Sequence, residues 1–185
     1  MNLTLATLLT ALAFLVLGFA LWRNAPVWQG ALRAFPRSEQ AALVLFGLAS
    51  VWFLWKVWNL SPADNLFNMD FTRFRLLLIG VFGATAIGSF LYVRDLLPIR
   101  GLAILLLLFA GEGLSAAFGR YDLPQRLLLV TVLYAVIVAA IFIGAAPYHM
   151  RNGIQWLLAS PGRARSVGIG FGVTGLVLGV VAFTY

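Results

Sequence analysis

Glu112 is the residue whose type and position most clearly predict chemistry, because it is the one charged residue in the apolar stretch LLLLFAGEGLSAAFG, residues 105–119. Arg100 and Arg120 flank this stretch, and a helix between them rises about 30 Å. Glu112 is twelve residues from Arg100 and eight from Arg120, so we expect it within roughly 3 Å of the middle of a membrane. A charged carboxylate at that depth is costly. The position therefore predicts that Glu112 is protonated, paired or in contact with a water-filled cavity.

Tyr134 is the first candidate partner of Glu112. If the next apolar run crosses the membrane in the opposite direction, eight residues counted inward from Arg126 reach Tyr134 at the depth of Glu112. Thr131 lies one turn nearer the interface, and Ser115 is on the same run as Glu112. We therefore expect a hydrogen bond between Tyr134 and a neutral Glu112.

This group of polar side chains is compatible with two roles. An acid inside a membrane can couple the movement of protons or cations to transport, and such acids are functional more often than not. Alternatively, it ties two helices together through a hydrogen bond worth about 0.6 kcal/mol on average. The structural role is favoured, because no second acid, lysine or histidine lies in the core of any apolar run.

A second feature is the glycine spacing in GIGFGVTGLVLG, residues 168–179. Small residues four apart make a flat helix face against which another backbone can pack closely. We expect this face to contact a neighbouring helix of the same chain, and the alternative is a second copy or another subunit. The four positions are Gly168, Gly172, Gly175 and Gly179.

Three arginines in the polar segment 147–166, Arg151, Arg163 and Arg165, are candidates for contact with acidic lipid head groups or with an acidic partner surface. The interpretation that we favour is simpler: these side chains orient the protein and extend their charges to the membrane surface.

Signatures of catalysis are absent from the sequence. It contains no cysteine, and His149 is its single histidine, so thiolate and multi-histidine metal sites are excluded. No Gly-x-Ser-x-Gly, His-Glu-x-x-His or nucleotide-loop motif occurs. We therefore expect no enzymatic activity, no metal and no cofactor.

The composition predicts an all-α, polytopic integral membrane protein. Apolar residues make up 62% of the 185 residues and charged residues only 10%, well below the roughly 25% that are charged in soluble domains. The net charge of +7 does not indicate nucleic-acid binding, because the basic residues lie between apolar runs. Six runs are long enough to cross the lipid bilayer as helices, and we expect them to form one membrane domain: 3–22, 41–60, 76–93, 101–119, 127–146 and 167–184.

The links between these runs predict orientation and further helices. The loops after the first, third and fifth runs carry eight Lys and Arg residues against five in the other two, so we expect both termini on the non-cytoplasmic side. The first run lacks a preceding basic residue and is long for a signal peptide, so we expect it to be retained as a span. Apolar residues at helical spacing predict short interfacial helices around 27–35, 66–74 and 154–158, and structured loops are the alternative for these three segments.

Two functional classes fit these features. The leading one is a non-catalytic accessory, assembly or scaffold component of a membrane complex, with the lipid bilayer and other proteins as partners. The alternative is a small transporter or channel, working as a homo-oligomer, in which Glu112 couples or selects ions. The second class requires Glu112, Ser115, Thr131 and Tyr134 to converge on one water-accessible path.

Overall fold

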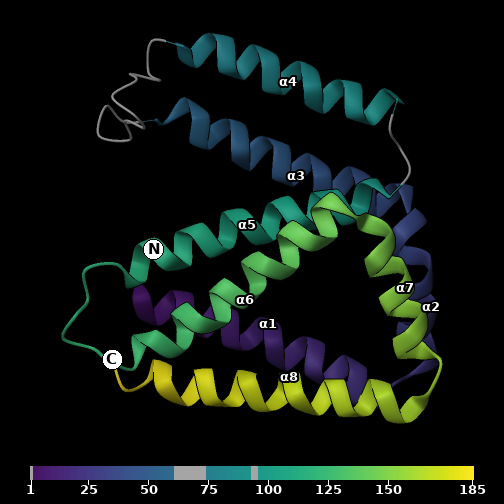
Figure 1. The fold of residues 1–185 in the computed structure, drawn as a ribbon, viewed down its shortest axis with the longest axis vertical. Helices are drawn as coiled ribbons and strands as arrows, with labels where there is room; N and C mark the ends of the chain where they lie inside the picture. The colour runs from purple at the N-terminus through teal and green to yellow at the C-terminus, as the bar shows by residue number, and fades with distance from the viewer. Residues whose placement is uncertain (1, 61–73, 93–95) are drawn as a thin grey trace.

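The computed structural model describes residues 2–60, 74–92 and 96–185, and within these ranges the chain is helical with no strand (Figure 1). Six helices are long and apolar enough to cross a membrane. The all-α fold with six candidate spans is therefore confirmed. The elements in chain order are α1 (Leu3–Arg23), α2 (Pro26–Ala34), the 3₁₀ helix η1 (Phe35–Arg37), α3 (Glu39–Trp58), α4 (Arg75–Tyr92), α5 (Leu97–Ala117), α6 (Arg126–Ala145), α7 (Pro147–Leu158) and α8 (Pro161–Ala182).

Four of the six long helices begin and end within two residues of the predicted runs, and the other two begin earlier. Helix α5 begins at Leu97 rather than at residue 101, and α8 begins at Pro161 rather than at 167. Both starts carry a proline in the first turn, Pro98 and Pro161. A proline is favoured there because its missing N–H would have no partner in the helix. Hydropathy alone placed these boundaries too late.

Two shorter helices, α2 and α7, run across the same end of the long helices (Figure 1). They fall where the sequence predicted helices, at 27–35 and 154–158, although α7 begins earlier, at Pro147. The third predicted helix, around 66–74, lies outside the described residues except for Phe74. The termini and the α5–α6 link lie at the opposite end, so the molecule has two distinct ends (Figure 1). We call them the α2–α7 end and the terminal end.

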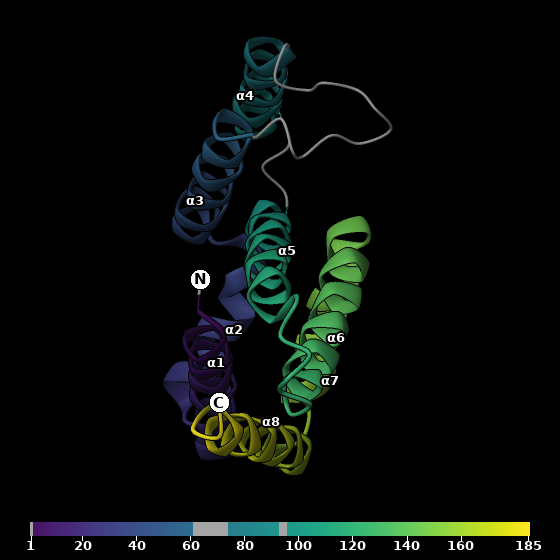
Figure 2. The same ribbon diagram turned by 90° about the vertical axis from the view of Figure 1, so that its left-hand side faces the viewer.

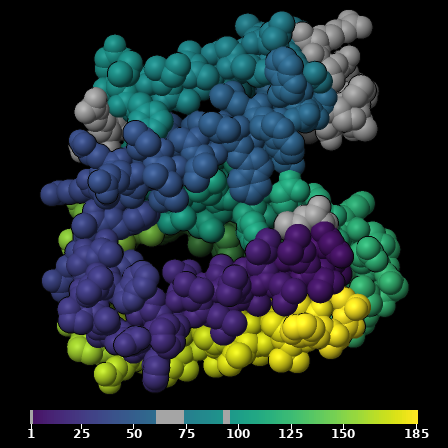
Figure 3. Space-filling model, turned by 180° about the vertical axis from the view of Figure 1, so that it is seen from behind, coloured from purple at the N-terminus to yellow at the C-terminus, as the bar shows by residue number. Residues whose placement is uncertain are grey.

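The long helices form two groups that meet at α5 and α6 (Figure 2). Helices α1 and α8 lie antiparallel and in contact along their lengths (Figure 3), with Phe14 edge-on to Phe171 at a ring distance of 5.4 Å. On the other side α3 packs against α5, and α4 packs against α3 through Phe53 and Phe82, 4.9 Å apart. Helix α4 is at the edge of the molecule and has no buried residue.

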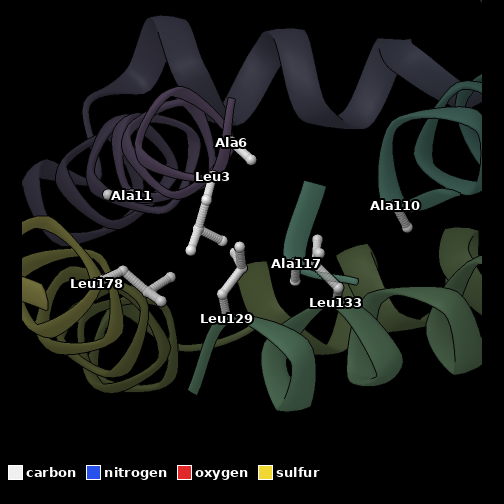
Figure 4. Close-up of a cluster of buried hydrophobic side chains, with 8 residues drawn as sticks. All are labelled: Leu3, Ala6, Ala11, Ala110, Ala117, Leu129, Leu133 and Leu178. Atoms are coloured by element: carbon white, nitrogen blue, oxygen red, sulfur yellow. The ribbon is translucent and has the colours of Figure 1, made fainter. Parts of the chain in front are cut away.

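Two clusters of buried side chains hold the groups together. Near the terminal end, side chains of α1, α5, α6 and α8 meet, and Leu3, Leu129 and Leu178 converge there (Figure 4). Near the α2–α7 end, Phe46 of α3 packs with Leu97 of α5. Because the buried side chains are mostly leucine and alanine, close helix packing in this bundle depends on small residues at the contacts.

Candidate functional site

Glu112 forms an ion pair with Lys56, which joins α5 to α3. Oε1 of Glu112 is in direct contact with Nζ of Lys56. The side chain of Glu112 is 24% exposed and that of Lys56 is 44% exposed, so the pair lies at the edge of the α3–α5 contact. An ammonium group in contact satisfies a carboxylate in an apolar setting. The sequence predicted the partner of Glu112 on the next long helix, α6, and the structure places it on α3.

The pair lies nearer the terminal end than the sequence predicted for Glu112. Because α5 covers Leu97–Ala117, its middle residue is Leu107, and Glu112 is five residues further on. Five residues correspond to about 7.5 Å along the helix. Lys56 is two residues from the last residue of α3, Trp58. A long lysine side chain near a helix end can place its charge at the membrane surface while its methylene groups stay in lipid. Both residues of the pair therefore lie in the halves of α3 and α5 that are nearer the terminal end.

The predicted hydrogen bond between Glu112 and Tyr134 is not formed in the described part of the chain. Tyr134 is 57% exposed on α6. The Ser115 hydroxyl donates to the carbonyl oxygen of Gly111 at 2.9 Å, and the Thr131 hydroxyl donates to that of Leu127 at 2.8 Å. Each of these bonds stays within one helix. None of the hydrogen bonds or ion pairs described for these four polar residues joins one of them to another.

Other hydroxyl groups in the long helices make the same bond. Each donates to the carbonyl oxygen four residues earlier, at 2.8–3.0 Å. Such bonds satisfy a hydroxyl in lipid without a partner on another helix. Among the described residues this group comprises Thr7, Thr10, Ser50, Thr85, Ser89 and Thr174.

The glycines of α8 pack against α1, so the neighbour of this face is in the same chain. A Cβ atom added at Gly168 would lie 2.6 Å from the backbone nitrogen of Trp22, and one at Gly175 would lie 2.8 Å from Cγ of Leu15. Both positions are too close for a side chain. Gly172 takes part through its backbone alone: a Cβ added at Gly18 would lie 2.6 Å from the Gly172 nitrogen, whereas a Cβ added at Gly172 itself would meet no atom within 4 Å.

The fourth glycine of the face, Gly179, is looser: its added Cβ would lie 4.0 Å from Cβ of Ala11. Sequence reasoning missed Gly18, which completes the contact from the other helix. It also missed Gly101 of α5, where an added Cβ would lie 2.5 Å from the Phe46 nitrogen of α3. Neither glycine belongs to a repeated spacing, so only the arrangement of the helices identifies them. Lys56, by contrast, left a signal: it is a lone cation near the end of an apolar run.

The three arginines predicted to contact head groups or a partner have different environments. The guanidinium group of Arg163 lies 4.9 Å from the ring centre of Trp156, and its Nη1 donates to the Trp156 carbonyl oxygen at 3.4 Å. Arg165 is exposed. Arg151 is half-buried and lines a groove between α7 and α2. Within the described ranges, no carboxylate lies within ion-pair distance of any of the three.

No group of three or more His, Cys, Asp or Glu side chains is placed to hold a metal ion in residues 2–60, 74–92 and 96–185. Comparison with known proteins found no match to a family model, to a curated protein or to a solved structure. The role of the Lys56–Glu112 pair is therefore argued from its geometry alone.

Proposed function

We propose that the chain is a non-catalytic component of a membrane complex, acting as an accessory, assembly or scaffold subunit. The observation that carries this proposal is how the polar groups of the long helices are satisfied. Glu112 pairs with Lys56, and the hydroxyl groups bond to their own helices. A transport path needs several polar groups that face a common route. The hydroxyl groups are instead satisfied within single helices, and charged side chains join α5 to α3 through Lys56 and to α6 through Arg126, whose Nη1 donates to the Ala117 carbonyl oxygen.

Helix α4 supports the same proposal. It has no buried residue and packs mainly against α3, while its apolar side chains are exposed along its length. Lipid can cover such a surface, and so can a helix of another protein. A helix at the edge that packs mainly against one neighbour has a free face for helix–helix packing in the membrane.

The alternative function is a small transporter or channel, and the Lys56–Glu112 pair is the observation that favours it. Ionisable groups inside membranes often belong to substrate or ion pathways. If this alternative holds, opening of the α3–α5 contact would expose the carboxylate of Glu112 to water and allow it to bind a proton or a cation.

Purification from the native membrane in a mild detergent, followed by measurement of the mass of the intact complex, tests the proposal. We expect other chains to be present in fixed stoichiometry with a tagged copy of this protein. A single chain or a homo-oligomer, stable in several mild detergents, would contradict the accessory role.

Ion flux into liposomes separates the two classes. We expect wild type, Glu112→Gln and Tyr134→Phe to give the same flux as empty liposomes. Proton or cation flux that is present in wild type and in Tyr134→Phe, and lost in Glu112→Gln, would establish the transporter instead. Tyr134→Phe is the control because it removes a polar atom from the neighbouring helix and leaves the Lys56–Glu112 pair intact.

A further inference from the structure

A groove at the α2–α7 end has the composition of an anion site. It lies between α7 on one side and α2 with η1 on the other, and its volume is about 330 Å³. Arg33 of α2 and Arg151 of α7 reach it from opposite sides, and Gln155 adds an amide. Pro36, Ile154 and Leu158 supply apolar walls. The groove thus combines three hydrogen-bond-donating side chains with an apolar lining.

The α7 side of this groove comes from one helix face. Arg151, Ile154, Gln155 and Leu158 are spaced by three, one and three residues, which places them on adjacent turns of the same face. An amphipathic helix that only rests on a membrane separates its polar and apolar residues onto opposite faces. Here the two kinds are mixed on the face that meets α2 and η1. This mixture suits a ligand that has a charged part and an apolar part.

The charges around the groove favour a negatively charged ligand. In the described ranges Glu39 is the one carboxylate residue at the α2–α7 end, and it does not line the groove. The ion pair in those ranges, Lys56–Glu112, lies toward the other end of the molecule. Seven arginines stand at or near the α2–α7 end: Arg23, Arg33, Arg37, Arg100, Arg151, Arg163 and Arg165.

We infer that this groove binds the phosphate of an anionic glycerophospholipid. Arg33 and Arg151 hold the phosphate oxygens, because guanidinium groups match phosphate geometry. Gln155 donates to the head group, and Ile154 and Leu158 contact the glycerol and the first acyl carbons. The two helices that line most of the groove, α2 and α7, lie across the ends of the long helices (Figure 1), the level at which head groups meet a protein of this kind. A free anion would leave the apolar walls without a partner.

Native mass spectrometry of delipidated protein in dodecyl maltoside tests this site. The protein is mixed with dioleoyl phosphatidylglycerol or with dioleoyl phosphatidylcholine, which share acyl chains and differ in head-group charge. We expect wild type to retain one phosphatidylglycerol molecule in preference to phosphatidylcholine. The double variant Arg33→Gln with Arg151→Gln should weaken that binding roughly tenfold or more, because each arginine near a membrane surface adds to the attraction.

The matched control is Arg23→Gln with Arg165→Gln. It removes the same charge from the same end, but neither residue lines the groove. We expect the control to keep its lipid. Equal loss in both double variants would show a diffuse basic surface and overturn the site, as would equal retention of the two lipids by wild type. Displacement of the lipid by inorganic phosphate alone would assign the groove to a free anion instead.

Folding of the variants is checked by thermal unfolding in the same detergent. If the double variant unfolds, Arg33→Gln alone replaces it, because Arg33 is exposed on α2 and its removal leaves no cavity. We expect Arg33→Gln to bind phosphatidylglycerol several-fold more weakly than wild type. Unchanged binding would exclude Arg33 and therefore the proposed site.

Discussion

At the scale of single residues, the partner of Glu112 decides how that acid is accommodated. The carboxylate is held by Lys56 of α3 and not by Tyr134 of α6. The sequence could predict that an acid in an apolar run needs a partner, because the cost of an unpaired charge follows from composition alone. It could not identify the partner, since α3 and α5 are separated in the chain by α4, and their parallel packing follows only from the fold.

Lys56→Met should destabilise the protein more than Glu112→Gln. Loss of Lys56 leaves the deeper carboxylate without its cation, for which we expect a cost of roughly 1–3 kcal/mol. Glu112→Gln leaves a lysine near the helix end that can reach the membrane surface, so its cost should stay below about 1 kcal/mol.

Denaturant unfolding in lipid nanodiscs measures these differences, and the double variant completes the cycle. We expect Lys56→Met with Glu112→Gln to be more stable than Lys56→Met alone. Strictly additive effects of the two substitutions would show that the ion pair contributes nothing to stability.

Tyr134→Phe should leave the unfolding free energy within about 0.5 kcal/mol of wild type, since surface changes away from packed or bonded groups have small effects. The reason is that Tyr134 is exposed on α6 and does not bond Glu112. The same unfolding measurement checks this expectation. A decrease of 1 kcal/mol or more in the unfolding free energy would indicate a direct bond between Tyr134 and Glu112.

At the scale of helices, the sequence predicts that the long helices exist and roughly how long they are, but it does not predict which helices pack against each other. Long apolar runs must form helices in a membrane, because every backbone group needs a partner within the segment. The helix starts at Leu97 and Pro161 were missed because they depend on a proline in the first turn rather than on apolar residues. Which helices touch depends on single small residues such as Gly18 and Gly101, which have no distinctive pattern in the sequence.

Gly168→Ala should destabilise the α1–α8 pair, and Gly170→Ala should not. A Cβ at Gly168 would meet backbone atoms of α1, the nearest at 2.6 Å, whereas a Cβ at Gly170 has no neighbour within 4 Å. We expect a loss of about 1–3 kcal/mol for the first, as for other overpacked contacts. The second should be neutral or slightly stabilising, because alanine favours a helix over glycine. Thermal unfolding of both variants in one detergent makes the comparison, and equal melting temperatures would contradict the packing.

At the scale of the whole molecule, the two ends differ in charge. The α2–α7 end carries the larger number of arginines, which predicts that it faces the cytoplasm. Because the chain has no cysteine, single cysteines can report this orientation without background labelling.

Asp122→Cys, in the exposed α5–α6 link, should react with a membrane-impermeant maleimide added outside intact cells. Asn152→Cys, exposed on α7, should react only after the membrane is opened. The intensity of the labelled band on a gel measures the reaction of each single-cysteine variant. The reverse pattern would invert the predicted orientation.

The contact between α1 and α8 has a consequence for the order in which the protein is assembled. Helix α1 is synthesised first of the six long helices and α8 last, with about 140 residues between them. At roughly 5–20 residues per second, the ribosome takes about 7–30 s to supply them. During that interval the surface of α1 around Gly18, which packs against α8 in the finished fold, has no helix to contact. The α8-facing surface of α1 is therefore exposed to lipid, or covered by an insertion factor, until α8 is made. If translation is stalled before residue 161, this surface of α1 should cross-link to other membrane proteins. Helix α1 can pack against α8 only once α8 has been translated, so insertion of the last span completes the fold.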